Sequence, residues 1–153
     1  MNRLHNCVFV FAVLTCLGCG PAAREAPSDL LPVSGTLTID GEPASHVTIV
    51  FTPDNATAGQ GGYTVTDDSG HFEVKHMSNV EGANGVEPGS YVLSFSKLTM
   101  PDGNPIPEGK DAADVGATES LPKKLSSPDP ERPAHILKVD EAKTDVKLDL
   151  KTK

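Results

Sequence analysis

From about residue 31 onward the chain alternates between apolar and polar positions in short runs separated by turn residues. In the first run, residues 33–39, the apolar side chains of Val33, Leu37 and Ile39 stand at odd positions, and hydroxyl side chains fill the even ones. Successive side chains of a β-strand point to opposite faces, so this period of two predicts a strand with one face inward. Further runs of this kind cover residues 47–52, 63–66, 71–75, 90–96, 135–139 and 144–150.

Turn residues separate these runs, and no sustained 3.6-residue apolar period is present. The turns are Asp40-Gly41, Asp67-Asp68-Ser69-Gly70 and Pro88-Gly89, all rich in residues that tolerate tight backbone bends. The side chains expected to point inward are Val33, Leu37, Ile39, Val47, Ile49, Phe51, Phe72, Val74, Tyr91, Leu93, Phe95, Val146, Leu148 and Leu150. Seven short strands at this spacing predict an all-β fold, a seven-stranded antiparallel β-sandwich over residues 31–153.

The first 18 residues are typical of a signal peptide. Arg3 precedes an apolar run, residues 7–17, of about 11 residues, which fits a signal peptide and is too short to span a membrane. The sequence Leu17-Gly18-Cys19-Gly20 resembles a bacterial lipobox, although Cys16 stands where a lipobox usually has a large aliphatic residue. The resemblance implies cleavage before Cys19 and a lipid, such as palmitate, on its sulfur. The alternative is an ordinary signal peptide cut near Ala22-Ala23.

Cleavage before Cys19 removes 18 of the 153 residues and leaves 135. Cys7 and Cys16 leave with the leader, so no thiol remains for a disulfide, and the exported domain must be stabilised by its core alone. Residues 19–30 are small and polar with two prolines, and we expect a flexible tether there.

Charge argues against a nucleic-acid partner. Removing Arg3 with the leader leaves 12 basic residues against 21 acidic ones, a net charge of −9. Nucleic acids require clustered Lys and Arg, whereas the acidic residues of this chain are interspersed with lysines. The chain has no Trp and only seven Phe and Tyr residues, so an aromatic platform for sugars is not obvious.

Candidate sites are few. The turn Asp67–Gly70 with Glu73 lacks the patterned oxygen spacing of a calcium loop, and we interpret it as a hairpin turn. His46, His71, His76 and His135 show no metal-ligand spacing, and we interpret them as solvated surface residues. We therefore expect no catalytic residues, no metal, no cofactor and no enzyme activity. The Pro-rich segment 99–133 has two interpretations, a disordered cover over a sheet edge or a binding loop.

Four phrases of the sequence resemble the carboxypeptidase regulatory-like and transthyretin-like sandwich domains. They are Pro32–Ala44 (PVSGTLTIDGEPA), Val47–Phe51 (VTIVF), Thr66–Phe72 (TDDSGHF) and Pro88–Leu93 (PGSYVL). With the lipobox in front and Leu121-Pro122 in a late loop, the chain resembles short lipoproteins of planctomycete-type bacteria; relatives tend to carry a Tyr where this chain has Leu125. The resemblance implies a fold and an exported location but no activity. A further expectation from the residues is that Tyr91 buries its ring and directs its hydroxyl to a loop backbone, as in a tyrosine corner.

These observations predict a non-catalytic, lipid-anchored cell-envelope protein, facing the periplasm or the cell surface, that binds or scaffolds envelope proteins or glycans. The alternative is a carbohydrate-binding accessory domain, for which Tyr63 is the best candidate contact.

Overall fold

The computed structural model describes residues 27–129 and 131–153. Within these residues the chain forms eleven strands and one short helix. They are β1 (Val33–Ile39), β2 (Glu42–Pro43), β3 (Thr48–Pro53), β4 (Gly62–Val65), β5 (His71–Glu73), β6 (Lys75–His76), β7 (Gly89–Ser96), β8 (Leu98–Thr99), β9 (Thr118–Glu119), α1 (Lys123–Ser126), β10 (Ile136–Val139) and β11 (Lys143–Leu150). Each of the seven alternating runs overlaps a strand of at least three residues, and the prediction of an all-β fold is confirmed.

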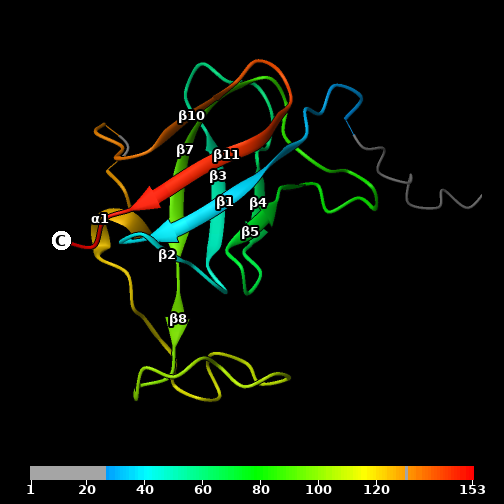
Figure 1. Cartoon of the computed structure of the whole chain (residues 1–153). Helices are drawn as coiled ribbons and strands as arrows, with labels where there is room; N and C mark the ends of the chain where they lie inside the picture. Colours follow the sequence, from blue (N-terminus) through cyan, green and yellow to red (C-terminus); the bar gives the residue numbers. More distant parts are fainter. Residues whose placement is uncertain (1–26, 130) are drawn as a thin grey trace, which may run out of the picture.

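The smaller sheet is built around β1. Strand β11 lies along one edge of β1, and β2 and β5 share the other edge. The pairing of β1 with β11 is parallel, with Gly35 opposite Val146 and Leu37 opposite Leu148 (Figure 1). The purely antiparallel arrangement that we expected is therefore wrong for this pair. Tight turns make consecutive strands antiparallel, but no turn joins β1 to β11, and side-chain alternation carries no information about strand direction.

The larger sheet has the order β10-β7-β3-β4-β6, and all its neighbouring strands are antiparallel. Strands β3 and β7 form its centre and pair over six positions, from Thr48 opposite Ser96 to Pro53 opposite Tyr91. The pairing of β3 and β7 ends at Thr48 and Ser96, although the chain continues in extended form from β7 into β8. This end of the sheet lies at the candidate functional site.

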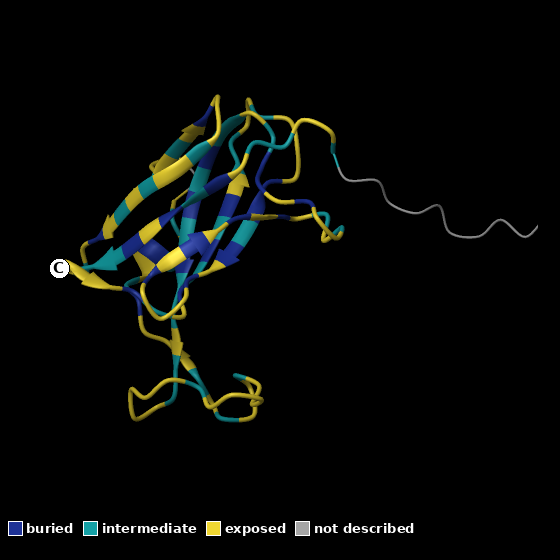
Figure 2. Ribbon diagram, turned by 45° about the vertical axis from the view of Figure 1, so that its right-hand side comes forward, coloured by how far each residue is buried: buried dark blue, intermediate teal, exposed yellow. Residues whose placement is uncertain are grey.

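The two sheets enclose one core, and we call these sheets and their core the body. Buried side chains of β1, β3, β5, β7, β10 and β11 meet between the two layers (Figure 2). The rings of Phe51 and Tyr91 contact edge to face, with centroids 6.4 Å apart. Of the side chains predicted to point inward, all are buried except Ile39, Val146 and Leu148, which are half-buried and pack against the core.

The predicted strand over residues 71–75 is two strands in different sheets. Residues before Val74 pair with β1 as β5, whereas residues after it pair with β4 as β6. Val74 is buried at the crossing, and its N–H donates to the carbonyl of Val33. The alternation of Phe72 and Val74 is preserved because both side chains face the same core from the point where the chain changes sheet.

Two glycines permit backbone contacts that a side chain would block. A Cβ at Gly35 would lie 2.0 Å from the carbonyl oxygen of Val146, so this position allows β1 and β11 to approach each other. Gly70 has φ +78°, and a Cβ there would lie 2.5 Å from the carbonyl oxygen of Leu37. Both positions favour glycine for steric reasons that the alternation pattern does not reveal.

The segment 99–133 is not one irregular loop. Strands β8 and β9 pair with each other, and residues 97–120 form an arm that projects from one end of the body (Figure 1). The chain then returns to the body, where Leu121 and Leu125 are buried in the core. The helix α1 was not expected, because four residues are too few to show a helical period.

Candidate functional site

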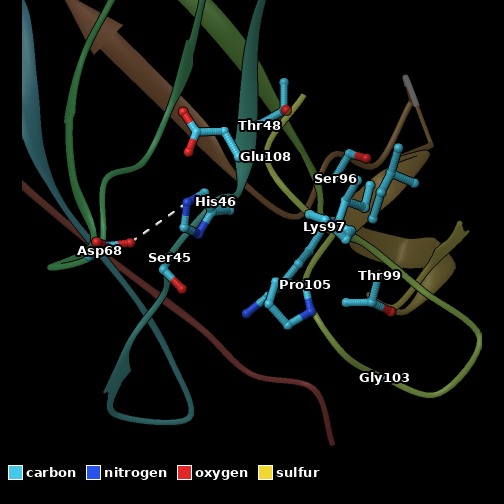
Figure 3. A pocket seen from close by; sticks show the side chains of 13 residues that line it. Ser45, His46, Thr48, Asp68, Ser96, Lys97, Thr99, Gly103, Pro105 and Glu108 are labelled. Carbon is cyan, nitrogen blue, oxygen red and sulfur yellow. Dashed lines mark ion pairs between the residues drawn. The ribbon is translucent and has the colours of Figure 1, made fainter. Parts of the chain in front are cut away.

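A groove lies between the body and the arm. Its volume is about 1030 Å³. One wall comes from the body and the other from the arm, and Figure 3 shows the side chains that line it. The lining residues are Ser45, His46, Thr48, Asp68, Ser96, Lys97, Leu98, Thr99, Gly103, Pro105, Ile106, Pro107 and Glu108. This groove is the candidate functional site.

The groove forms because the larger sheet divides at its end. Beyond the Ser96–Thr48 pair, β7 continues into the arm while the chain preceding β3 bends away. His46 adopts φ 56°, a left-handed backbone conformation, and its N–H donates to the carbonyl of Thr66 at 3.1 Å. The residues before β3 therefore stay beside β4, and the space next to β8 remains open.

Hydrogen bonds at its base fix the direction of the arm. One carboxylate oxygen of Glu119 accepts the N–H of Lys97 at 3.0 Å and the N–H of Leu121 at 2.8 Å. The N–H and the hydroxyl of Ser120 both donate to the carbonyl of Lys97, at 2.9 and 2.7 Å. These contacts hold the two strands of the arm together where they leave the body.

The groove carries both signs of charge. His46 Nε2 lies 3.6 Å from Asp68 Oδ1, and both side chains are largely exposed. Lys97 contributes a cation and Glu108 a second anion. An exposed pair of this kind contributes little to stability, so these groups remain available for a ligand. Hydroxyl groups and proline rings supply most of the other surface.

The acidic turn Asp67–Gly70 is a tight turn between β4 and β5. These strands lie in different sheets and do not pair with each other, so the interpretation as a hairpin turn is wrong. Asp67 Oδ1 accepts the N–H of Ser69 at 2.9 Å, the hydroxyl of Ser69 at 2.7 Å and the N–H of His71 at 2.9 Å. These hydrogen bonds, from the Ser69 hydroxyl above all, lower the pKa of Asp67 below its usual value. The carboxylate thus stabilises the turn. Within the described residues, no group of three or more His, Cys, Asp or Glu side chains is placed to hold a metal ion.

The four histidines occupy different environments. His46 lines the groove, and His71 lies 3.9 Å from the exposed carboxylate of Glu73. His135 packs edge to face on Phe95, and burial lowers its pKa. The interpretation of all four as solvated surface residues is wrong for His76, which is buried.

His76 belongs to a buried polar network that the sequence did not reveal. Its Nε2 lies 3.0 Å from Glu87 Oε1, and its Nδ1 lies 2.7 Å from the hydroxyl of Ser78. The N–H of Ser78 also donates to Nδ1 at 3.2 Å, which makes Nδ1 an acceptor and places the ring proton on Nε2, toward Glu87. No spacing rule connects residues 76 and 87, because the loop between them brings them together.

The two tyrosines differ as expected in burial. The Tyr91 ring is fully buried, and its hydroxyl donates to the carbonyl of Glu87 at 2.6 Å, so the predicted bond to a loop backbone is confirmed. Burial raises the pKa of Tyr91 to about 12, and the charge of Glu87 adds to this effect. Tyr63 lies on β4 with its hydroxyl 3.5 Å from Asn79 Oδ1, and it does not line the groove.

The predicted lipidation site, Cys19, lies outside the described residues, as do the leader and most of the tether. The single helix within the described residues is far too short to cross a membrane.

Comparisons with known proteins give little information about this chain. No protein-family model matches it, and no curated protein matches it significantly. Among solved structures it is similar to a 9R-lipoxygenase from Cyanothece PCC8801, with 20% sequence identity and a TM-score of 0.35; the match covers 86% of this chain and 18% of the lipoxygenase. Our prediction that the chain is not an enzyme is contradicted by this neighbour, which is an enzyme, and we withdraw that prediction. A TM-score this low transfers neither fold nor activity.

Proposed function

We propose that the protein is an exported, lipid-anchored cell-envelope protein that binds or scaffolds other envelope components through the groove. The leader and the lipobox-like sequence ending at Cys19 motivate the anchor. The tether, residues 19–30, then separates the domain from the membrane. The net charge of −9 after removal of the leader disfavours a nucleic-acid partner.

The observation that carries this proposal is the position of the groove relative to the tether. Leu31, the first residue after the tether, forms a two-bond bridge with Val86, at 2.8 and 3.1 Å. Strand β7 begins three residues later and runs for eight residues before the arm starts. The groove therefore lies about 25 Å along β7 from the attachment end. A domain tethered at Leu31 presents the groove away from its point of attachment.

We further propose that the body is a seven-stranded sandwich related to the carboxypeptidase regulatory-like and transthyretin-like domains. Support comes from where the four sequence phrases lie. They fall on β1 with its turn into β2, on β3, on the turn before β5 and at the start of β7. The sandwich that we propose includes the parallel pairing of β1 with β11 described above.

Fractionation of cells expressing the full chain tests the anchor. We expect the protein to sediment with membranes and to enter the detergent phase, and mass spectrometry to find an acylated Cys19 at a new N-terminus. The Cys19→Ser variant, which keeps the apolar leader, should not acquire the lipid and should leave the detergent phase. A wild-type chain that is soluble without detergent, or that keeps an intact leader, would contradict the proposal.

A further inference from the structure

The divided end of the larger sheet leaves a strand position empty beside β8. Among the described strands, β8 pairs with β9 alone, along one of its two edges. The other edge faces the groove, where β3 would lie if it continued in register. Because Ser96 is opposite Thr48, Leu98 is level with position 46. His46 has turned away at that level to bond Thr66.

The backbone groups of Leu98 point into this empty position. In an antiparallel ladder, alternate residues direct their N–H and C=O groups to opposite edges. The carbonyl of Lys97 accepts the N–H of Ser120, so the backbone groups of Lys97 point toward the other strand of the arm. The next residue, Leu98, therefore directs its N–H and C=O toward the groove. A second hydrogen bond leads to the same result. The Asp54 N–H donates to the Ser90 carbonyl, so the even-numbered residues of β7 direct their backbone groups toward β3, and Leu98 continues this alternation.

The surroundings fit a polypeptide better than a sugar or an acyl chain. The groove is lined by no Phe or Tyr ring on which a sugar could stack. It contains four charged or titratable side chains and several hydroxyl groups, which disfavour an acyl chain. Leu98 is 42% exposed and Ile106 also lines the groove, so apolar contacts for a peptide side chain are present.

We propose that an extended polypeptide segment docks in the groove as an added strand on the free edge of β8. The segment pairs with the backbone of Leu98, and its flanking residues continue along the groove, so that about four residues, or about 13 Å of strand, are accommodated. His46, Asp68 and Glu108 then contact its side chains from the groove walls. This inference rests on the proposed binding function and names the chemistry of the partner.

A pair of substitutions at one residue tests the docking mode. Leu98→Pro removes the N–H that faces the groove, whereas Leu98→Ala keeps it and shortens the side chain. The probe is a random twelve-residue peptide library displayed on phage and selected on the full chain, followed by titration of the enriched synthetic peptide. We expect binding to weaken at least about tenfold in Leu98→Pro and less than about threefold in Leu98→Ala.

Hydrogen exchange of the unaltered chain supplies a second readout, which remains valid even where Leu98→Pro does not fold. We expect the peptide to slow exchange of the Leu98 amide. The inference is overturned by a selection that enriches no peptide, by equal binding to wild type and Leu98→Pro, or by protection confined to other amides. Loss of membrane attachment in the fractionation experiment would refute the anchor and leave these results unchanged, so the two failures are distinguishable.

Discussion

The body and the arm both contain antiparallel strand pairs, but these pairs differ in what they bury. Strands β3 and β7 pair over six positions and place Ile49, Phe51 and Leu93 in a core shared by two sheets. Strands β8 and β9 pair over two positions, and no side chain from residue 97 to residue 120 is buried. Pairing alone is therefore sufficient to give the arm a direction, but the burial of apolar side chains is what stabilises the fold.

This difference indicates a division of roles. A core that tolerates few changes holds the ends of β3 and β7 in fixed positions. The arm contributes no fully buried side chain, so its sequence can change with little effect on stability. The groove lies between the body and the arm. One of its walls is therefore attached to the core, and the other has no fully buried side chain. The following predictions test this contrast, in order of decreasing expected effect.

Truncation of a core ring should show most clearly that the body contributes more to stability than the arm. Phe51→Ala removes a fully buried ring between the sheets, and we expect it to lower the free energy of unfolding by about 3–5 kcal/mol. Ile106→Ala in the arm should change it by less than about 0.5 kcal/mol. Urea denaturation of both variants measures the difference, and losses of similar size would contradict the contrast.

Alkaline pH should destabilise the body through Tyr91. Burial raises the pKa of Tyr91 to about 12, compared with about 10 in an unfolded chain, so the folded state favours the neutral phenol. The resulting stabilisation is fully present below pH 10 and is lost as the pH rises toward 12; it amounts to about 2–3 kcal/mol. Unfolding measured from pH 8 to 12 should show this decline in wild type and a smaller decline in Tyr91→Phe. Identical profiles would refute the assignment.

Removing the buried imidazole should destabilise the loop between β6 and β7. His76→Leu leaves Glu87 Oε1 without its donor from the ring, and we expect a loss of about 1–3 kcal/mol in the free energy of unfolding. The matched variant His71→Leu alters an exposed histidine and should cost less than about 0.5 kcal/mol. Thermal unfolding at pH 7 measures the stability of both variants. Equal stability of His76→Leu and His71→Leu would show that the buried His76–Glu87 pair contributes nothing.

A smaller, pH-dependent effect is expected at the turn before β5. Hydrogen bonds from Ser69 and His71 lower the pKa of Asp67, so its ionised form stabilises the fold above the unfolded-state value near 3.9. That contribution is lost as the pH falls through the lowered folded-state pKa. Asp67→Asn should therefore be less stable than wild type at pH 7, with the gap narrowing in acid. Asp68→Asn, which alters an almost fully exposed carboxylate, serves as the matched control and should cost less than about 0.5 kcal/mol at pH 7.

Shortening the arm should have the smallest effect. Replacing residues 100–117 with Asn-Gly joins Thr99 to Thr118 by a two-residue hairpin turn. We expect the free energy of unfolding to change by no more than about 0.5 kcal/mol, because none of the replaced residues is fully buried. A loss comparable to that of Phe51→Ala would show that the arm belongs to the core.

Side-chain alternation was enough to predict the strands of the body and most of the core. Every inward residue predicted on β3, β5 and β7 is buried, since alternation reports directly on which side chains leave water. The parallel direction of β11 and the change of sheet at Val74 could not be predicted this way. Both depend on which strands become neighbours, and the local sequence does not contain that information.

The groove was only partly foreseeable. The Pro-rich composition of residues 99–133 indicated an unusual segment, and a binding loop was one of its two interpretations. What could not be predicted is that His46 and Asp68, from distant turns, meet this segment at one end of the sheet. The burial of His76 was also not predictable. Its place in the alternation pattern does not show whether its ring is solvated or hydrogen-bonded inside the fold.

The parallel neighbours β1 and β11 also constrain the order in which the domain is completed. Hydrogen bonds between them connect residues 110 positions apart, so this edge of β1 stays unpaired until residues 143–150 have emerged from the ribosome. Contacts this distant in sequence form late and slow the folding reaction. Under the export that we propose, such a delay would be useful, because it keeps the polypeptide unfolded while it is translocated.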